Sequence, residues 1–423
     1  MEFVCQKSDL FGSVDVPASK SHTIRGVLLA SLADGESTLL DPLTSEDTAA
    51  AISVYRQLGA EFEMGEREWR IKGTGCRFRI PDETLDVKNS GTTLRIVLGS
   101  ASLLPEGEIR ITGDRQIQSR PNGPLVDALN DLGAHIESDS GDGCVPFRIR
   151  GVLRGGRTGI EAKTSQYVTS LLLCCPLAAN DTEIDVPLLH EKPYVHMTLD
   201  WLRHQEVRVE HEELRRFHIP GGQQFRPFTR RIPADFSSAT FFLVAGALGN
   251  NDIVCRGLDM KDSQADKAVV GFLQEMGAVI EVSNDTVAVR SAQLRGVDID
   301  MNDCPDALPM MAVAGCFANG TTRLLNVPQA RIKETDRIAV MCAELKRRGA
   351  DIEELPDGLV IHESRLQGGP VNGHSDHRVV MAMAMAGTLI PGTTRVTTAE
   401  AAAVTFPQFA EFIQALGGDL IIR

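Results

Sequence analysis

The sequence predicts a mixed α/β protein of two domains, built from six copies of one structural unit. Three observations lead to this prediction: the length of 423 residues, a segment ending that recurs six times, and an apolar helix upstream of each ending. A chain of this length exceeds one ordinary hydrophobic core, so more than one domain is expected. Three copies per domain would give two domains of about 215 residues.

The recurring ending reads as the last turn of an amphipathic helix, a glycine and a short strand. Its copies are YRQLGAEFE, LNDLGAHIE, LRHQEVRVE, LQEMGAVIE, LKRRGADIE and IQALGGDLI, which recur about every 72 residues. Because glycine accepts the left-handed conformation that stops a helix, the glycine of each copy is expected to end one. These positions are Gly59, Gly133, Gly277, Gly349 and Gly417, with Gln205 in the place of glycine in the third copy.

Upstream of each ending lies an apolar segment rich in small residues. The six segments are SKSHTIRGVLLASL, NSGTTLRIVLGSASLL, TSQYVTSLLLCCPLA, DFSSATFFLVAGALG, PDALPMMAVAGCFA and SDHRVVMAMAMAGTL. Helices that are apolar on nearly every face must be buried. One unit is too small to bury its own apolar helix, so several units are expected to pool these helices and to place their sheets outside.

The composition argues against several classes of partner. With a formal net charge of −14, the chain lacks the excess of lysine and arginine that nucleic-acid and anionic-membrane surfaces require. The nine cysteines show no metal-ligand spacing and predict reduced, buried side chains. No run reaches about 18 apolar residues and no basic leader precedes the first strand, so a cytoplasmic protein is expected.

Basic residues nevertheless gather at the N-terminal ends of the buried helices and in the loop before the second helix of a unit. They are Lys20, Arg25, Arg95, Arg120, Lys333, Arg337 and Arg378. Helix N-termini present free backbone N–H groups and a partial positive charge, so this placement favours phosphates and carboxylates. Taken singly, each cation could be an ordinary cap or surface residue; their shared placement in the repeat indicates a multiply anionic substrate.

Two acidic residues share this placement and are candidate proton carriers. Asp306 lies in DCPDALP at the start of a buried helix, and Glu334 lies in RIKETDR between Lys333 and Arg337. A carboxylate beside cations is also typical of a helix cap or an ion pair, and that alternative stays open for both. His374 and His377 are a weak pair, more typical of hydrogen-bond donors at a helix start, so no metal is expected.

The chain resembles the enolpyruvylshikimate-phosphate synthase family from its first strand to its last helix. The segments that carry the resemblance are PASKSHTIR, NSGTTLR, SRP, TSQYVTSLL, EKPYVHMTL, DFSSATFF, PDALP, RIKETDRI, SDHR and TFPQF. The resemblance implies a two-domain inverted α/β barrel of six similar βαβαββ-type units, with buried helices and outer sheets. It also implies domains of residues 19–233 and of residues 1–18 with 234–423, and an active site in the interdomain cleft.

The resemblance implies transfer of the enolpyruvyl group of phosphoenolpyruvate to the 5-hydroxyl of shikimate 3-phosphate, without a cofactor. Residues implied for shikimate 3-phosphate are Lys20, Ser21, Arg25, Thr164, Ser165, Gln166, Asp306 and Lys333, with Tyr194 and Gln329 as further candidates. Residues implied for phosphoenolpyruvate are Lys20, Gly91, Arg120, Gln166, Arg337 and Arg378. Asp306, Glu334 and Lys20 are the implied catalytic residues. The two substrates are the only expected partners, and the expected state is a monomer.

Four positions depart from the common pattern of the family, Ala18, Thr164, Glu191 and Val404, and the last two bear on substrate binding. Glu191 stands where many members have a serine that helps to bind the shikimate phosphate, and a carboxylate there would repel the phosphate unless it turns away. Val404 stands where some members have a lysine for phosphoenolpyruvate, so that role is not transferred.

Three alternative functions compete with this interpretation of the sequence. A UDP-N-acetylglucosamine enolpyruvyl transferase is disfavoured, because the segment around Arg120 lacks the reactive cysteine that such enzymes need. An enolpyruvyl transferase with another acceptor stays open, with Glu191 as its warning sign. A catalytically inactive anion-binding relative also stays open, although Asp306, Glu334 and Lys20 are all present.

Overall fold

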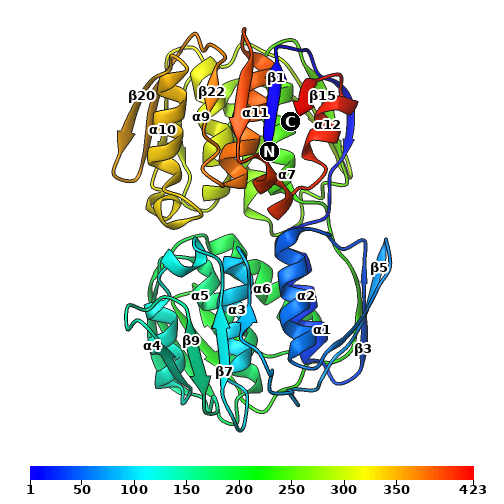
Figure 1. Ribbon diagram of the computed structural model, residues 1–423, viewed down its shortest axis with the longest axis vertical. Coiled ribbons are helices and arrows are strands. Elements are labelled where there is room, and N and C mark those ends of the chain that lie inside the picture. Colours follow the sequence, from blue (N-terminus) through cyan, green and yellow to red (C-terminus); the bar gives the residue numbers. More distant parts are fainter. The chain divides into compact units, whose positions relative to one another are not determined.

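A computed structural model describes all residues of the protein, Met1–Arg423. The chain forms two compact units, which are described separately (Figure 1). The middle unit comprises Ala18–Ile232, and the terminal unit comprises Met1–Pro17 together with Pro233–Arg423. Both units mix helices with four-stranded sheets, as the sequence predicts for an α/β protein.

The middle unit contains three sheets, in the strand orders β14-β3-β5-β4, β6-β7-β9-β8 and β10-β11-β13-β12. Its α-helices are α1 (Lys20–Leu32), α2 (Glu46–Gln57), α3 (Gly91–Ala101), α4 (Gly123–Asp131), α5 (Ser165–Cys174) and α6 (Lys192–His204). Its strands are β3 (Glu36–Leu40), β4 (Glu61–Met64), β5 (Glu68–Lys72), β6 (Leu85–Asp86), β7 (Ile109–Thr112), β8 (His135–Ser138), β9 (Phe147–Arg150), β10 (Gly156–Ala162), β11 (Thr182–Leu189), β12 (Glu210–Glu212), β13 (Arg216–Ile219) and β14 (Thr229–Arg231). Short 3-10 helices are η1 (Ile117–Ser119) and η2 (Cys175–Leu177).

The terminal unit also contains three sheets, in the strand orders β22-β23-β1-β24, β16-β17-β15-β2 and β18-β19-β21-β20. Its α-helices are α7 (Phe236–Ala247), α8 (Ala268–Met276), α9 (Leu308–Phe317), α10 (Arg337–Arg347), α11 (His377–Leu389) and α12 (Phe409–Ala415). Its strands are β1 (Glu2–Gln6), β2 (Phe11–Asp15), β15 (Asp252–Arg256), β16 (Val279–Val282), β17 (Thr286–Arg290), β18 (Asp298–Asp300), β19 (Thr321–Leu325), β20 (Asp351–Leu355), β21 (Gly358–His362), β22 (Pro370–Val371), β23 (Thr394–Thr397) and β24 (Asp419–Ile422). Its 3-10 helices are η3 (Ala265–Lys267), η4 (Pro305–Ala307), η5 (Pro328–Ile332) and η6 (Ala399–Val404).

Every sheet has the same pattern of strand directions. One edge strand runs parallel to its neighbour, as β10 does to β11, and the other strands pair antiparallel. Some of these pairs join distant parts of the chain. β14 pairs with β3 in the middle unit, and in the terminal unit β1 lies between β23 and β24. The repeated strand pattern agrees with a repeated unit in the sequence.

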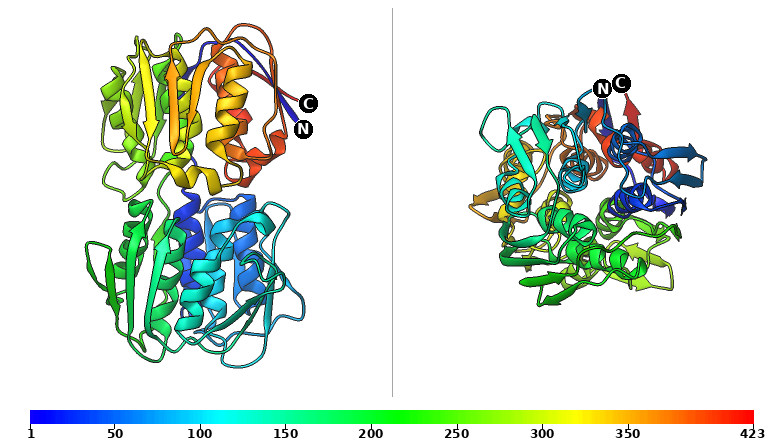
Figure 2. Two further views of the ribbon diagram at one scale, coloured as in Figure 1. Left: turned by 90° about the vertical axis from the view of Figure 1, so that its left-hand side faces the viewer. Right: turned by 90° about the horizontal axis from the view of Figure 1, so that it is seen from below.

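The apolar helices are buried, as their composition predicts. Every residue of α7 is buried, and α7, α9 and α11 contact one another in the terminal unit. In the middle unit α3 contacts both α1 and α5, and strands lie on the outside of the helices (Figure 2). Small residues permit the close contact: a Cβ added to Gly99 of α3 would lie 2.6 Å from Ser170 Oγ of α5. The second helix of a unit, such as α6, buries only one face.

The glycines of the recurring ending do end helices. Gly59, Gly133, Gly277, Gly349 and Gly417 all have φ between 94° and 110°, a left-handed conformation that costs glycine little. The prediction for the third copy was wrong by one residue. Gln205 is the C-cap of α6 with φ −83°, and the following Glu206 has φ 58° and takes the glycine position. Glu206 is the fifth residue of LRHQEVRVE, the place that glycine holds in the other copies, so the left-handed position is the same in all six copies.

Two further predictions concern cysteines and membrane spans. All nine cysteines are free thiols and eight of them are buried, as predicted, whereas Cys76 is half-buried. Burial raises the pKa of the Cys255 thiol to about 12, which keeps it protonated. None of the helices combines the length and the hydrophobicity that a bilayer crossing requires.

Candidate active site

The predicted site residues form two clusters, one in each compact unit. The Lys20 cluster lies in the middle unit, around the first residues of α1, α3 and α5. It contains Lys20, Ser21, Arg25, Gly91, Arg120, Thr164, Ser165 and Gln166. The Arg337 cluster lies in the terminal unit, around the first residues of α9, α10 and α11. It contains Asp306, Lys333, Glu334, Arg337 and Arg378.

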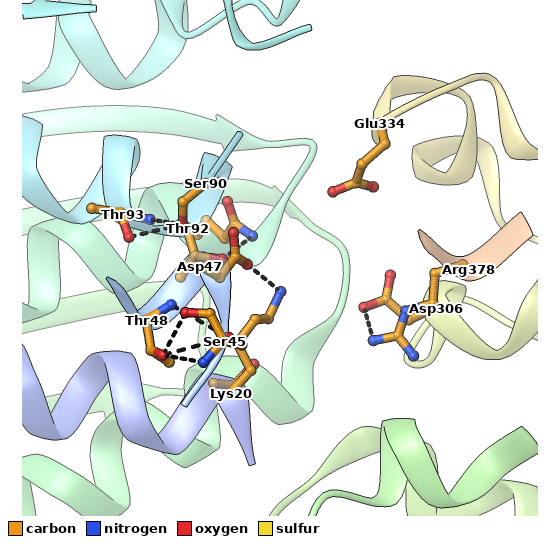
Figure 3. A network of polar contacts seen from close by, with 12 residues as sticks. Lys20, Ser45, Asp47, Thr48, Ser90, Thr92, Thr93, Asp306, Glu334 and Arg378 are labelled. Carbon is orange, nitrogen blue, oxygen red and sulfur yellow. Dashed lines mark hydrogen bonds and ion pairs between the residues drawn. The ribbon is translucent and has the colours of Figure 1, made fainter. Parts of the chain in front are cut away.

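Lys20 is the first residue of α1 and is held by a carboxylate. Its Nζ lies 3.1 Å from Asp47 Oδ2, and both side chains are largely buried (Figure 3). Asp47 belongs to the first turn of α2, whose start is fixed by a capping box between Ser45 and Thr48. A buried ammonium requires such a partner, so α2 positions the lysine that the sequence predicts to be catalytic.

Gly91 begins α3 and lets two guanidinium groups approach the backbone. A Cβ at this position would lie 2.7 Å from Arg120 Nη1 and 2.9 Å from Arg95 Nη1. Arg95 donates to Gln166 Oε1 at 2.7 Å and to Asn122 Oδ1 at 3.1 Å. Two buried cations therefore lie beside the N-terminus of a helix, which itself attracts anions.

Thr164 and Ser165 start α5 and bind a carboxylate of the protein itself. Glu191 Oε2 accepts hydrogen bonds from Thr164 Oγ1 at 3.1 Å, from the Ser165 N–H at 3.0 Å and from Ser165 Oγ at 2.7 Å. The expectation left open whether Glu191 turns away. In this structure it turns toward the two hydroxyls.

Arg25 lies deeper in the middle unit than a surface ligand contact would require. Its guanidinium donates to Thr198 Oγ1, to Thr169 Oγ1 and to the backbone carbonyls of Ser21 and Tyr194. Burial lowers the pKa of Arg25 to about 10, which leaves it protonated at neutral pH. These contacts join α1 to α5 and α6, so Arg25 supports the helices that present the neighbouring site residues.

Arg337 is almost completely buried and binds three carboxylates. It donates to Asp306 Oδ1 at 2.7 Å, to Glu334 Oε2 at 2.5 Å and to Asp376 Oδ2 at 2.9 Å. Burial opposes the charge of Arg337, but the carboxylates of Asp376, Glu334 and Asp306 outweigh it and raise its pKa above the usual value. Arg337 therefore stays a cation at any working pH, fixed by its own unit.

Arg378, in the first turn of α11, shares Asp306 with Arg337. Its Nη2 lies 3.3 Å from Asp306 Oδ2, and its Nη1 donates to the Ser237 carbonyl at 3.1 Å (Figure 3). Although burial opposes its charge, Asp306 raises the pKa of Arg378. Asp306 thus bridges two buried guanidiniums, an arrangement in which a carboxylate can accept a proton when a ligand takes over the cations.

Glu334, Asp376 and His377 are the one group of potential metal ligands, with ligand atoms within 4.8 Å of one another. Arg337 donates to both carboxylates of this group. A guanidinium at that position repels a metal ion, so the group does not fit a metal centre. Burial lowers the pKa of His377 to about 3, which keeps the imidazole neutral.

The remaining residues predicted to contact shikimate 3-phosphate lie in three different environments. Gln329 is buried and donates to the Asn302 carbonyl at 2.7 Å, so its amide already serves the loop before η4. Lys333 is half-buried at the end of η5. Tyr194, half-buried in α6, gives its backbone carbonyl to Arg25.

The sequence interpretation missed two carboxylates that organise these clusters, Asp47 and Asp376. Each lies within two residues of a helix start, after a serine in TSED and in SDHR, a pattern typical of caps. That pattern could have singled them out. It could not have assigned their partners, because Asp376 binds Arg337 from 39 positions away.

The comparisons with known proteins agree with one another. Residues 4–413 match the family model described as EPSP synthase (3-phosphoshikimate 1-carboxyvinyltransferase). The chain is 50% identical over 415 residues to the 3-phosphoshikimate 1-carboxyvinyltransferase of Acetivibrio thermocellus and 48% identical over 415 residues to that of Ruminiclostridium cellulolyticum, with 98% of each chain covered in both cases. It is also similar to a solved EPSP synthase from Acinetobacter baumannii, with a TM-score of 0.84, 26% identity and 99% of both chains covered.

Proposed function

Because the chain belongs to the EPSP synthase family, we propose that it is a 3-phosphoshikimate 1-carboxyvinyltransferase. It transfers the enolpyruvyl group of phosphoenolpyruvate to the 5-hydroxyl of shikimate 3-phosphate and releases phosphate, a step toward chorismate and the aromatic amino acids. The observation that carries the proposal within the molecule is the Arg337 cluster. It brings the RIKETDR and SDHR segments and Asp306 together around one buried cation.

The six four-stranded sheets and the buried helices support a finer description of the fold. We propose an inverted α/β barrel of six similar βαβαββ-type units, three in each of two domains. In such a fold the apolar helices fill the interior and the sheets face outward. The helix N-termini then carry the polar chemistry.

For shikimate 3-phosphate we propose the contacts that the family resemblance implies. Thr164 and Ser165 offer two hydroxyls and the backbone N–H groups at the start of α5, donors of a kind that suits a phosphate, although Glu191 accepts from three of them in this structure. The remaining proposed contacts are Lys20, Ser21, Arg25, Gln166, Asp306 and Lys333. The contacts of Arg25 within α1 and with α5 and α6 support an indirect part for it, in which it fixes Ser21 and the position of α5.

For phosphoenolpyruvate we propose the cations Lys20, Arg120, Arg337 and Arg378, with Gly91 and Gln166. The near contact of Gly91 with Arg120 supports this set, because it leaves a helix N-terminus and a guanidinium side by side. Four cations match a substrate that carries both a phosphate and a carboxylate, and they also stabilise the phosphate as it leaves.

The chemistry is an addition followed by an elimination. The 5-hydroxyl oxygen bonds to C2 of phosphoenolpyruvate while C3 gains a proton, and Asp306 takes the hydroxyl proton. The tetrahedral intermediate then loses phosphate from C2, and C3 gives back a proton so that the double bond re-forms. Glu334, aided by Lys20, carries the proton at C3. Burial of the neighbouring His377 supports a neutral, non-competing imidazole beside Glu334.

A phosphate-release assay with purified protein tests the proposal. Release that requires both phosphoenolpyruvate and shikimate 3-phosphate, with the enolpyruvyl product identified by mass, is the expected result. A second function is favoured by one observation, the carboxylate of Glu191 on the hydroxyls of Thr164 and Ser165. An enolpyruvyl transferase for an acceptor without phosphate would release phosphate with shikimate in preference to shikimate 3-phosphate.

A further inference from the structure

Glu191 is a buried carboxylate at the junction between β11 and α6. It is the N-cap of α6, only 2% of it is exposed, and its backbone has φ 58° and ψ 44°. A left-handed conformation is uncommon for a residue with a side chain, so the surrounding contacts must hold it. The side chain is directed to the start of a different helix, α5, and not to its own.

Glu191 Oε2 accepts three hydrogen bonds from the first residues of α5. The donors are two hydroxyls and one backbone N–H, a set suited to an anion at a helix N-terminus. Thr164, the N-cap of α5, could have capped that helix with its own hydroxyl. It makes no such cap bond and donates to Glu191 instead.

We infer that Glu191 is a specificity-determining residue, because its carboxylate occupies the donors proposed for the phosphate of the acceptor. This inference rests on the proposed function. The carboxylate and the phosphate are alternative occupants of one subsite, since two anions that share three donors about 3 Å away repel each other strongly in a desolvated site. Shikimate 3-phosphate therefore binds only after Glu191 leaves Thr164 and Ser165.

Glu191 therefore weakens the binding of a phosphorylated acceptor but not the binding of an acceptor without phosphate. An acceptor that lacks the phosphate does not compete with Glu191, so replacing Glu191 leaves its binding nearly unchanged. For shikimate 3-phosphate the replacement removes the competing anion and exposes the hydroxyls and the N–H. Selectivity for the phosphorylated acceptor then increases.

Two substitutions and one control test the inference. Glu191→Ser removes the anion and its bulk, whereas Glu191→Gln removes only the charge and keeps an acceptor oxygen. The glutamine variant therefore tests the inference even if the serine variant folds poorly. The control is Glu161→Gln, which removes one exposed carboxylate from β10 in the same unit. For each protein the Kd and the KM are measured for shikimate 3-phosphate and for shikimate, together with the thermal midpoint.

Both constants for shikimate 3-phosphate are expected to fall about tenfold or more in Glu191→Ser, by less in Glu191→Gln, and not at all in Glu161→Gln. Constants for shikimate are expected to stay within twofold. Unchanged or weaker binding of shikimate 3-phosphate by both Glu191 variants would overturn the inference and leave Glu191 as a helix cap or a substrate contact.

The measurements distinguish a failure of this inference from a failure of the proposed function. If the wild type releases phosphate with shikimate 3-phosphate while the Glu191 variants match it, the inference fails and the function stands. If the wild type accepts only shikimate and Glu191→Ser gains activity with shikimate 3-phosphate, the proposed acceptor is wrong and the inference about the subsite stands.

Discussion

Replacing Asp376 by asparagine is expected to destabilise the terminal unit and weaken phosphoenolpyruvate binding together. Asp376 is fully buried and accepts four hydrogen bonds: from Arg337 Nε at 2.9 Å and Nη2 at 3.2 Å, from Thr335 Oγ1 at 2.9 Å and from the Arg378 N–H at 2.9 Å. Asparagine keeps the shape. It removes the charge and turns an N–H₂ group toward the guanidinium.

The size of the effect follows from the burial of the pair. Removing one partner of a buried ion pair costs about 3–5 kcal/mol, because the other charge stays desolvated. Arg337 keeps Glu334 and Asp306, so the lower end, about 3 kcal/mol, is expected. For a unit of this size that corresponds to a melting temperature lower by roughly 6–12 °C.

Thermal melts and steady-state kinetics would check this expectation. The KM for phosphoenolpyruvate should rise, because the Arg337 guanidinium loses one of its carboxylates and the start of α11, which carries Arg378, loses the charge of its cap. The matched control is Asp298→Asn, which breaks an exposed pair with Arg323 and should change stability little. An Asp376→Asn protein with the melting temperature and the KM of the wild type would refute the conclusion that Asp376 positions the Arg337 guanidinium and the start of α11.

Four further changes have defined outcomes. Asp306→Asn should keep binding of shikimate 3-phosphate but lower turnover by about 100-fold or more, the usual scale for a positioned base, and turnover within a few-fold of wild type would exclude that role. Gly91→Ala should leave the melting temperature nearly unchanged, since the new Cβ comes closest to the side-chain ends of Arg120 and Arg95. It should raise the KM for phosphoenolpyruvate by roughly tenfold or more as the Arg120 guanidinium shifts. An unchanged KM would count against Arg120 in the donor site. The pKa of His377 is about 3 in the folded protein and about 6.5 in the unfolded chain, so between these values only the unfolded state binds the proton. The free energy of unfolding should therefore fall by about 2 kcal/mol from pH 7 to pH 5. Denaturant titrations of His377→Gln should lack this component of the pH dependence. Val404 is buried in η6, so Val404→Lys should lower the melting temperature without improving the KM for phosphoenolpyruvate, and a lower KM would show that this segment reaches the donor.

Much of the fold was predictable because its signals are local. The segment DFSSATFFLVAGALG is apolar on every face, and all of α7 is buried accordingly. The glycines of the recurring ending lie in left-handed conformations, which glycine adopts at little cost. The same property explains why glycine recurs at that position. The error at Gln205 arose where the copy lacks a glycine. Glu206, one residue later, holds the fifth position that glycine has in the other copies and takes the left-handed conformation.

The site was predictable only as a list of residues. Lys20, Gly91 and Arg337 could be singled out because each lies at a helix start or in the loop before one, where anions bind. Their roles toward the two substrates stay predictions. Asp47 and Asp376 escaped notice because an acidic residue near a helix start is common, and nothing nearby in the sequence distinguishes a cap from an ion-pair partner.

The sequence by itself determined which segments are buried helices and where those helices end, because periodicity and backbone preference act over a few residues. Only the tertiary structure decided which charges meet. Arg337 collects carboxylates from positions 306, 334 and 376, and Glu191 binds the start of a helix 26 positions earlier. Such pairs depend on how separate helices and loops pack within a unit, and the energy of each pair depends on the burial that the packing creates.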